Sequence, residues 1–361
     1  MSVIACRPGA VPALAGTAQA DTAFVASELR PYLADLLARE QAAWKERGAP
    51  WCDPPEALGA YLADGKALRP RFCYWGHAIA GEEAGPLLVQ AAAALELLHA
   101  FALIHDDLMD DSDTRRGRPA LHREISGNHR GQGWAGDPDS YGRAIALLTG
   151  DLAFAMASRI AAGLPGHAKQ VWRQMVDELV AGQFLDLAGA ARQDRSPEVA
   201  RTTTLLKSGR YTVTRPLSLG AALAGLPELP QGLARYGDLV GEAFQLSDDL
   251  LGVFGDPRKT GKPVGEDLAS GKPTQLLACA ATMLPPRWQA LLALAGTPAF
   301  TAADVAELTR QLIRCGARDQ IEQKARRNVQ AACALVEGAG LPPGVAAALR
   351  ALAMAATERQ R

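Results

Sequence analysis

The chain has 361 residues, of which 48% are hydrophobic, and this is enough for a substantial buried core. Its formal net charge of −1 argues against nucleic acid or an anionic membrane surface as a partner. The six cysteines are scattered without a CxxC pair, which indicates reduced, intracellular thiols rather than a disulfide framework or a zinc site. We expect no apolar run as long as a membrane span, and therefore a cytoplasmic protein.

The first 20 residues predict a mobile tail rather than a targeting signal. They lack the basic start of a signal peptide, and Arg7-Pro8 interrupts their apolar stretch. A short ordered arm is the alternative for this segment. Residues 21–361 are expected to form one domain, although this length is above the usual size for a single core.

From residue 21 onward the periodicity is helical almost throughout. Apolar residues recur at intervals of three and four in 21–44, which is typical of an amphipathic helix. The segment 85–107 is apolar on nearly every side and predicts a central, buried helix. Further helices are predicted at 140–163, 167–191 and 233–256.

Turn signals separate these helical segments. Gly/Pro clusters lie at 163–166, 225–232 and 338–344, and the segment 126–142 is expected to be one long loop. Few segments alternate in the manner of a strand. The sequence therefore predicts an all-α fold.

Five aspartates lie between residues 106 and 113, directly after the apolar helix. If the helix continues, Asp106 and Asp110 lie one turn apart, as do Asp107 and Asp111. Like charges at this spacing cost about 0.2–0.5 kcal/mol per pair even when they are exposed, and more beside a buried helix. A cation must offset this cost, and a set of carboxylates suits Mg²⁺ or Mn²⁺ better than zinc.

A second acidic segment makes a metal site the better interpretation. An isolated cluster could equally be a solvated helix end paired with the nearby arginines. However, Asp248 and Asp249 end another apolar helix, and Asp256 follows them. Two acidic helix ends that face each other across a helical bundle would bind a diphosphate through bridging Mg²⁺.

A di-iron or di-manganese bundle is the competing metal site. It requires two Glu-x-x-His pairs within helices. The chain shows this pattern once, at residues 96–99, and we find no second copy.

Basic residues in Gly-rich or Pro-rich surroundings accompany the two acidic segments. Arginine forks and lysine point charges suit phosphate oxygens, although any one of these residues alone is more often a solvated surface charge. Together they favour a site for two anionic substrates and a metal. They are Lys66 and Arg69, Arg115 and Arg116, Lys207 beside Ser208, and Lys259, Lys262 and Lys272.

With these motifs in order, the sequence resembles the trans-prenyltransferase family, the isoprenyl diphosphate synthases. The resemblance covers most of the chain between about residues 60 and 280. Its matching blocks are GKxLRP at 65–70, the segment 97–122 with DDxxD, 147–157, GQxxD at 182–186, Lys-Ser at 207–208 and the segment 244–272. It implies a bundle of ten or more helices around a central apolar cavity, and a homodimer.

The resemblance also implies roles for individual residues. In the first motif, Asp106, Asp107 and Asp110, the first and last hold Mg²⁺, and Asp248 and Asp249 hold a third ion. Mn²⁺ is a possible substitute. Isopentenyl diphosphate is assigned to Lys66, Arg69, His99 and Arg116, the allylic diphosphate to Arg115, Lys207 and Lys262, and cavity-lining positions to Ser208, Gln183 and Gln245.

One position departs from the family pattern. The second motif is usually DDxxD, but its last carboxylate is replaced here by Gly252. This departure puts the third-ion site in question, and Asp256 is a candidate substitute. It also keeps a non-catalytic partner subunit open as an alternative function. A class I terpene cyclase is the other alternative, but it needs no second diphosphate site.

The expected product is the twenty-carbon geranylgeranyl diphosphate. Residues one turn before Asp106 should form the floor that stops the growing chain, and a turn spans about 5.4 Å, similar to one isoprene unit. Phe101 is large and Ala102 is small there, a pattern that resembles synthases making this product. A fifteen-carbon or twenty-five-carbon product is the alternative.

Overall fold

The structure is a computed structural model that describes residues 19–48, 53–63, 65–255 and 265–357. Helices make up nearly all of the regular structure, so the prediction of an all-α fold is confirmed. The helical elements are α1 (Ala20–Phe24), the π-helical segment η1 (Val25–Leu29), α2 (Arg30–Glu46), α3 (Pro54–Ala63), α4 (Leu68–Ala78), α5 (Pro86–Met109), α6 (Leu121–Gly131), α7 (Pro138–Ala161), α8 (Gly166–Ala191), α9 (Pro197–Thr203), the π-helical segment η2 (Thr204–Thr214), α10 (Arg215–Leu223), α11 (Leu233–Phe254), α13 (Glu266–Ala269), α14 (Gln275–Met283), α15 (Pro286–Leu292), α16 (Ala302–Arg314), α17 (Ala317–Gly338) and α18 (Pro343–Ala355).

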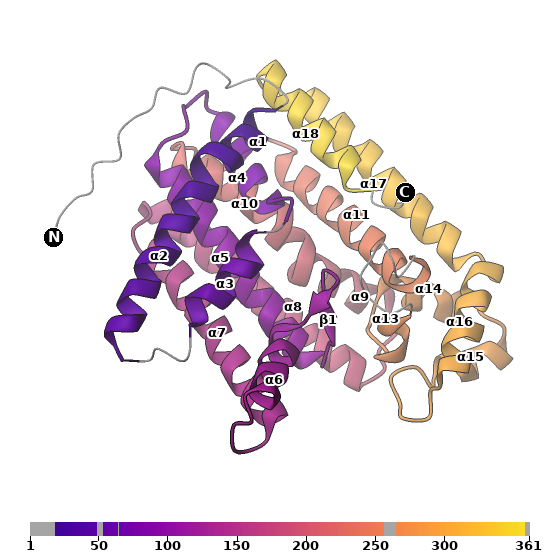
Figure 1. Cartoon of the computed structure of the whole chain (residues 1–361). Coiled ribbons are helices and arrows are strands. Elements are labelled where there is room, and N and C mark those ends of the chain that lie inside the picture. Colours follow the sequence, from indigo (N-terminus) through magenta and orange to yellow (C-terminus); the bar gives the residue numbers. More distant parts are fainter. Residues whose placement is uncertain (1–18, 49–52, 64, 256–264, 358–361) are drawn as a thin grey trace.

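Helix α5 lies at the centre of the bundle. Pro86 occupies its first turn, where the missing N–H costs no hydrogen bond. The run Ala91–Leu95 is fully buried, and its small side chains let neighbouring helices approach closely. α2 runs along one side of the bundle, and α17 and α18 run along the opposite side (Figure 1). One hydrophobic core cluster extends from Ala20 to Ala356.

Glycines allow a close contact between helices α4 and α10. A Cβ on Gly76 would lie 2.0 Å from the carbonyl oxygen of Leu217, and one on Gly220 would lie 1.8 Å from that of Cys73. Neither backbone oxygen can move away cheaply. The two helices therefore pack at a distance that only glycine allows.

The long loop predicted at 126–142 is wrong at both of its ends. α6 continues to Gly131 and α7 begins at Pro138, capped by the side chain of Asp137, which accepts from the N–H of Ser140 at 2.9 Å. The rings of His129, Trp134 and Tyr141 contact one another and close the short connection. These ring contacts link the two helices across the turn. The Gly and Pro residues of the segment indicated a loop, and no helical spacing in the sequence indicated the ring contacts.

The described strands form one short hairpin, β1 (Thr114–Arg115) and β2 (Arg118–Pro119). Arg116 (φ 54°) and Gly117 (φ 75°) both have left-handed backbone conformations at its turn. Two such residues are typical of the tight turns that match the twist of a hairpin. The hairpin folds the basic segment back toward the end of α5.

The predicted N-terminal tail lies mostly outside the described residues. Residues 19 and 20 are described, and Ala20 begins α1 with an exposed fraction of 3%. The described helices therefore begin at Ala20, one residue before the expected start of the domain at residue 21.

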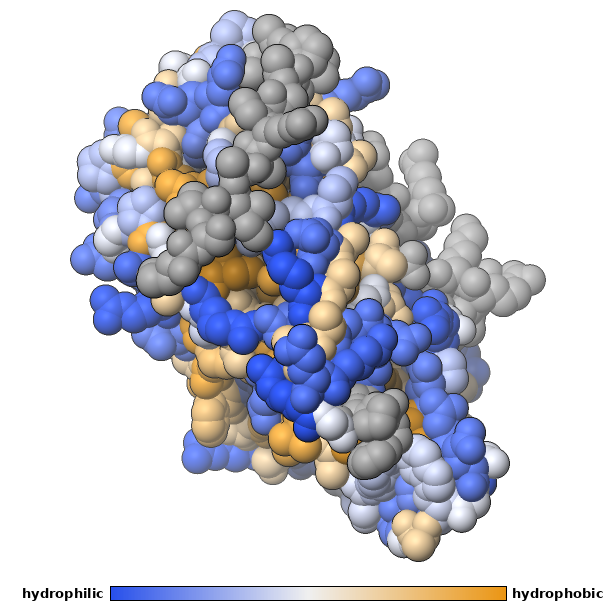
Figure 2. All heavy atoms as spheres, turned by 60° about the vertical axis from the view of Figure 1, so that its left-hand side comes forward, coloured by the Kyte–Doolittle hydropathy of each residue, from blue (hydrophilic) through white to orange (hydrophobic). Residues whose placement is uncertain are grey.

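We expected no apolar run as long as a membrane span, and this expectation is wrong. α5 and α7 each have 24 residues and are apolar enough to cross a membrane. In the most apolar 18-residue stretch of each helix, 61% is buried in α5 and 39% in α7. The first is therefore a core helix, and the second has an exposed apolar face. Figure 2 shows hydrophilic side chains over much of one face, with hydrophobic patches between them.

Candidate active site

A cavity of about 1270 Å³ lies between the ends of α5, α8, η2 and α11. It is larger than the roughly 300–1,000 Å³ that is usual for small-molecule sites, which leaves room for two substrates. Most of the predicted site residues line it: Lys66, Arg69, His99, Ala102, Asp106, Arg115, Arg116, Gln183, Lys207, Ser208, Gln245, Asp248 and Asp249. Phe101, Asp107 and Asp110 are adjacent to lining residues, whereas Lys259, Lys262 and Asp256 lie outside the described residues.

The end of α5 presents Asp106 to the cavity between two basic groups. Lys207 donates to Asp106 Oδ1 at 3.0 Å, and Arg115 lies 3.6 Å from Asp106 Oδ2. Burial alone would raise the pKa of Asp106, but Lys207, Lys272 and Arg115 outweigh it and hold that pKa well below its ordinary value. The carboxylate is therefore ionised.

Asp107 holds Arg115 in place. The Nε of Arg115 donates to both oxygens of Asp107, at 2.9 and 3.1 Å, and the terminal guanidinium nitrogen contacts one of them. Asp107 is buried, with an exposed fraction of 1%, and it is not among the residues that line the cavity. In this arrangement its carboxylate orients the guanidinium toward the site.

Lys272 connects the first acidic segment to the loop before α14. Its ammonium donates to Asp110 at 2.5 Å and lies 3.7 Å from Asp267. Burial lowers the pKa of Lys272, but Asp267, Asp106 and Asp110 outweigh it and raise that pKa above its ordinary value. The lysine is charged, and it was noted in the sequence without an assigned role.

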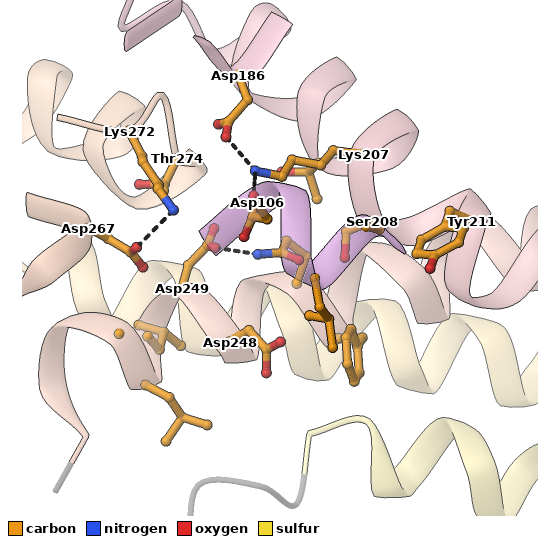
Figure 3. A pocket seen from close by; sticks show the side chains of 18 of the residues that line it. Asp106, Asp186, Lys207, Ser208, Tyr211, Asp248, Asp249, Asp267, Lys272 and Thr274 are labelled. Carbon is orange, nitrogen blue, oxygen red and sulfur yellow. Dashed lines mark hydrogen bonds and ion pairs between the residues drawn. The ribbon is translucent and has the colours of Figure 1, made fainter. Parts of the chain in front are cut away.

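Lys207 is positioned by the π-helical segment η2. Its ammonium contacts Asp186 of α8 at 2.5 Å as well as Asp106 (Figure 3). A Cβ on Gly182 would lie 2.2 Å from the backbone nitrogen of Lys207, so α8 and η2 approach at a distance that requires glycine. The wider π-helical turn and this close approach aim Lys207 into the cavity.

The second acidic helix end lies opposite on α11. Asp249 is buried and accepts a hydrogen bond from Gln245 at 2.8 Å, one helical turn earlier. Burial, followed by the charge of Asp267, raises the pKa of Asp249 to about 8. Asp106, Asp249 and Asp267 surround the same space, whereas the side chain of Asp248, the preceding residue of α11, points away from it (Figure 3).

A second basic group lies deeper, around the ring of Tyr211. The guanidinium carbon of Arg69 lies 4.1 Å from the ring centre, and Arg69 donates to Thr212 at 2.9 Å. The Tyr211 hydroxyl is 3.3 Å from Nδ1 of His99. Burial, together with the neighbouring guanidinium groups, holds the pKa of His99 well below its ordinary value, so the imidazole is neutral.

The other two predicted residues of this group lie nearer the surface. Lys66 and Arg116 are exposed, and the Arg116 guanidinium lies against the backbone of Gly65 and the carbonyl of Tyr61. Glu96 is buried nearby on α5, where burial raises its pKa against the opposing charges of Arg69 and Arg116. Nothing in the sequence groups Glu96 with these basic residues, because the only motif that contains it is the single Glu-x-x-His pattern at residues 96–99.

The predicted floor residues of α5 differ in where they point. Ala102 lines the cavity, whereas the ring of Phe101 packs against His105 at 4.5 Å and against Phe154 of α7 at 5.0 Å, between ring centres. Phe154 had no signal in the sequence, because its contact with Phe101 depends on how α7 packs against α5.

The donor set fits a hard divalent cation that keeps much of its own hydration. Among the described residues, no three His, Cys, Asp or Glu side chains converge closely enough to enclose an ion. Magnesium usually takes one or two carboxylates and completes its coordination with water and substrate phosphates. Carboxylates on two facing helix ends, with lysines beside them, satisfy this requirement.

Comparisons with known proteins agree with the geometry. Residues 55–312 match the family model described as polyprenyl synthetase. The chain is 34% identical over 320 residues to the (2E,6E)-farnesyl diphosphate synthase of Mycobacterium tuberculosis, covering 82% of this chain and 80% of the relative. It is 33% identical over 295 residues to the geranylgeranyl diphosphate synthase of the same organism, covering 79% and 78%.

The solved structures include a similar fold with bound isoprenyl diphosphate and magnesium. The geranylgeranyl pyrophosphate synthase of Corynebacterium glutamicum, complexed with isoprenyl diphosphate and magnesium, matches with a TM-score of 0.82 and 35% identity. The match covers 92% of this chain and 99% of that chain.

Proposed function

The chain belongs to the polyprenyl synthetase family and is a prenyltransferase, and on this premise we propose that it makes geranylgeranyl diphosphate. The reaction is the condensation of isopentenyl diphosphate with an allylic diphosphate, namely the dimethylallyl, geranyl or farnesyl compound. The observation that carries this proposal is the pair of acidic helix ends, each with basic partners, on one cavity of about 1270 Å³.

The acidic residues are assigned to Mg²⁺. Asp106 and Asp110 would hold ions at the end of α5, and Asp248 and Asp249 would hold one at the end of α11. We propose about three ions, with Mn²⁺ as a substitute, because each carboxylate group supplies only part of a coordination shell. When bound, Mg²⁺ supplies Lewis-acid stabilisation of the diphosphate.

The allylic diphosphate is assigned to the basic groups beside Asp106. Arg115, Lys207 and Lys262 would contact its oxygens, and Ser208, Gln183 and Gln245 would line its binding site. Gln183 already lies 3.5 Å from Asp106. Lys207 and Lys272 now neutralise aspartates, and substrate binding would let their ammonium groups turn to phosphate oxygens.

Isopentenyl diphosphate is assigned to the deeper basic group formed by Lys66, Arg69, His99 and Arg116. Arg69 is already held by Tyr211 and Thr212, which fixes its guanidinium before the substrate arrives. The neutral His99 would donate a hydrogen bond to the diphosphate without adding charge. Four such groups are more than a terpene cyclase requires, so they favour a two-substrate enzyme.

The positions of these groups account for catalysis by charge stabilisation. The basic side chains stabilise the diphosphate as it leaves the allylic carbon, which becomes cation-like. The double bond of isopentenyl diphosphate attacks that carbon, a new carbon–carbon bond forms, and a proton is lost to the departing diphosphate. The apolar walls formed by Ala102, Leu103 and Leu179 exclude the water that would hydrolyse the cation.

The product length is assigned from the floor of the cavity. Ala102 leaves room beside α5, whereas Phe101 and Phe154 together form a bulky pair behind it. This combination favours twenty carbons over fifteen or twenty-five.

We further propose that residues 21–361 act as one prenyltransferase domain in a cytoplasmic homodimer. An exposed apolar surface supports the dimer: Leu148 of α7 and Phe184 of α8 have exposed fractions of 60% and 71%. Leu147 and Val180 extend it, with exposed fractions of 47% and 43%. A surface of this kind is typical of a protein–protein interface.

The test is an elongation assay with the full chain, labelled isopentenyl diphosphate, Mg²⁺ and each of the three allylic primers. The products are dephosphorylated and sized, and a twenty-carbon alcohol is the expected result. Another chain length would contradict the product assignment alone. Failure with every primer would contradict the catalytic proposal and favour a partner subunit, or a cyclase if a hydrocarbon forms without isopentenyl diphosphate.

A further inference from the structure

The loop that carries Lys272 is held from outside the cavity by an arginine of the segment that follows α8. The ammonium group of Lys272 contacts Asp110 at 2.5 Å and lies 3.7 Å from Asp267. The carbonyl of the preceding residue, Gly271, accepts a hydrogen bond from Nη1 of Arg195 at 3.0 Å. Lys272 lines the cavity of about 1270 Å³, whereas Arg195 does not. The arginine therefore reaches the loop from outside the candidate active site.

Close backbone contacts fix the loop on both sides of Lys272. Gly271 has a φ of 64°, and a Cβ there would lie 2.7 Å from the carbonyl oxygen of Ala295. On the other side, Pro273 packs so closely against α8 that a Cβ on Gly189 would lie 2.8 Å from its ring. The hydrogen bond from Arg195 thus acts on a segment that has little room to shift.

A second residue of the same segment holds the surface against which Gly271 packs. The side-chain amide of Gln193 donates to the carbonyls of Ala293 at 2.9 Å and Ala295 at 3.3 Å. Gln193 has a φ of 50°, a left-handed conformation that is common just after the end of a helix. Gln193 and Arg195 therefore secure the two sides of one contact, the first through Ala295 and the second through Gly271.

Arg195 gives up hydration to make its contact with the loop. Burial lowers the pKa of Arg195, and the charge of Asp194 opposes that effect only in part. Nη2 of Arg195 is buried and has no hydrogen-bond partner among the described residues. An arginine that served only as surface charge would extend its guanidinium into water and keep all of its hydrogen bonds. The cost of this placement is offset by what the side chain holds, which is the Gly271 carbonyl.

We infer that Arg195 is a positioning residue for Lys272. The inference rests on the proposed function, in which the Lys272 ammonium turns from Asp110 to an oxygen of the diphosphate. Arg195 fixes the backbone from which the Lys272 side chain extends, so that only the side chain has to rotate when the diphosphate binds. A backbone that is already ordered loses less entropy on binding, which raises the affinity for diphosphate.

The test is a double-mutant cycle that measures diphosphate binding rather than turnover. Calorimetry gives the affinity of the full chain for inorganic diphosphate at saturating Mg²⁺. Arg195→Met keeps an apolar side chain without donors and should lower this affinity about 3–10-fold, the effect of losing one hydrogen bond. Arg195→Lys keeps a donor and should recover most of the affinity. In a Lys272→Met background, Arg195→Met should have no further effect, because its contribution passes through Lys272.

A second measurement follows the lysine itself. The full chain without ligands is acetylated briefly with acetic anhydride, and the modified lysines are quantified by mass spectrometry. Lys272 should react faster in Arg195→Met than in the unmodified chain, because a looser loop releases its ammonium from Asp110 more often. Lys207, on η2, should keep its rate, whereas a general loosening of the fold would raise both. Arg192→Met, an exposed change in the same segment, is the matched control and should alter neither measurement.

Two results would overturn the inference. One is an Arg195→Met protein that binds diphosphate as tightly as the unmodified chain. The other is an equal loss of affinity with and without the Lys272 side chain, since Arg195 would then act on the fold in general. If Lys272→Met does not fold, the acetylation decides, and an unchanged rate at Lys272 would overturn the inference. If the unmodified chain itself bound no diphosphate with Mg²⁺, the proposed function would be at fault instead.

Discussion

Two lysines of the cavity are held by carboxylates that substrate or metal could later replace. Lys207 contacts Asp106 and Asp186, and Lys272 contacts Asp110. Charges taken out of water need such partners, because an unpaired buried charge costs far more than the pair contributes. These contacts keep Asp106, Lys207 and Lys272 together and ionised.

Asp249 behaves differently from Asp106, because burial raises its pKa to about 8. At neutral pH its carboxyl group is mainly protonated in the folded, metal-free protein, whereas the unfolded chain has lost this proton above about pH 4. Folding then takes up a proton, so the contribution of Asp249 to the free energy of unfolding falls as pH rises from about 4 to 8.

The variant Asp249→Asn should remove this penalty in the metal-free protein. Relative to the unmodified chain, its melting temperature should gain about 2 °C or more between pH 5 and pH 8. The measurement is thermal unfolding in the presence of a chelator at both pH values, with Asp177→Asn, an exposed change on α8, as the control. A difference in melting temperature that stayed constant with pH would show that Asp249 ionises normally.

At the scale of single elements, α5 combines two tasks. Its middle is a fully buried run of small and aliphatic residues, and its end delivers Asp106 to the cavity. The face that carries Phe101 packs against α7, and the neighbouring residue Ala102 faces the cavity. One helix therefore positions both the proposed metal-binding end and the proposed floor.

Replacing Phe101 by Ala should lengthen the product by at least one isoprene unit. The ring fills the space between α5 and Phe154, and its removal opens that space toward α7. The measurement is the size of the dephosphorylated product with each primer. Leu87→Ala, on the same helix and exposed, is the control. An unchanged product distribution would exclude Phe101 as the stop.

The contact between α4 and α10 predicts a stability effect that depends on local space. Gly76→Ala would bring a methyl group 2.0 Å from the Leu217 carbonyl, and this overpacking should lower the free energy of unfolding by about 1–3 kcal/mol. Gly127→Ala in α6 meets nothing within 4 Å and should raise it by about 0.5–1 kcal/mol. Chemical denaturation of both variants measures the difference, and equal effects would contradict the close packing.

At the scale of the whole molecule, apolar surface remains uncovered on two helices beside α5. His105 of α5 contacts the carbonyl of Leu147 on α7 at 3.2 Å, and Met109 contacts Gln183 on α8 at 3.6 Å. The exposed residues Leu148 and Phe184 lie on these same two helices. This surface adjoins the active-site end of α5, so a second subunit there would also support the cavity wall.

Phe184→Glu should convert the proposed dimer into a monomer. A charge placed at the centre of an apolar interface cannot be solvated, so association should weaken by a large factor. The measurement is light scattering coupled to gel filtration over a range of concentrations. Arg173→Glu, an exposed change on the same helix, is the control. Monomers in both variants and in the unmodified chain would contradict the dimer.

From the sequence alone we predicted the helical class, the position of the principal helices and thirteen of the residues that line the cavity. This was possible because helical periodicity and the two acidic segments are local signals, readable within a few turns. The resemblance to a known family then linked basic residues that lie far from those segments in the chain.

Which charged groups meet depends on how the helices and loops pack against one another. Asp107 pairs with Arg115 because a hairpin folds back, and Lys272 reaches Asp110 across 162 positions of sequence. The glycine that replaces an aspartate at position 252 looked like a loss in the sequence, but the structure places Asp267 beside it. Such contacts depend on how whole helices pack, and no local pattern of residues records that.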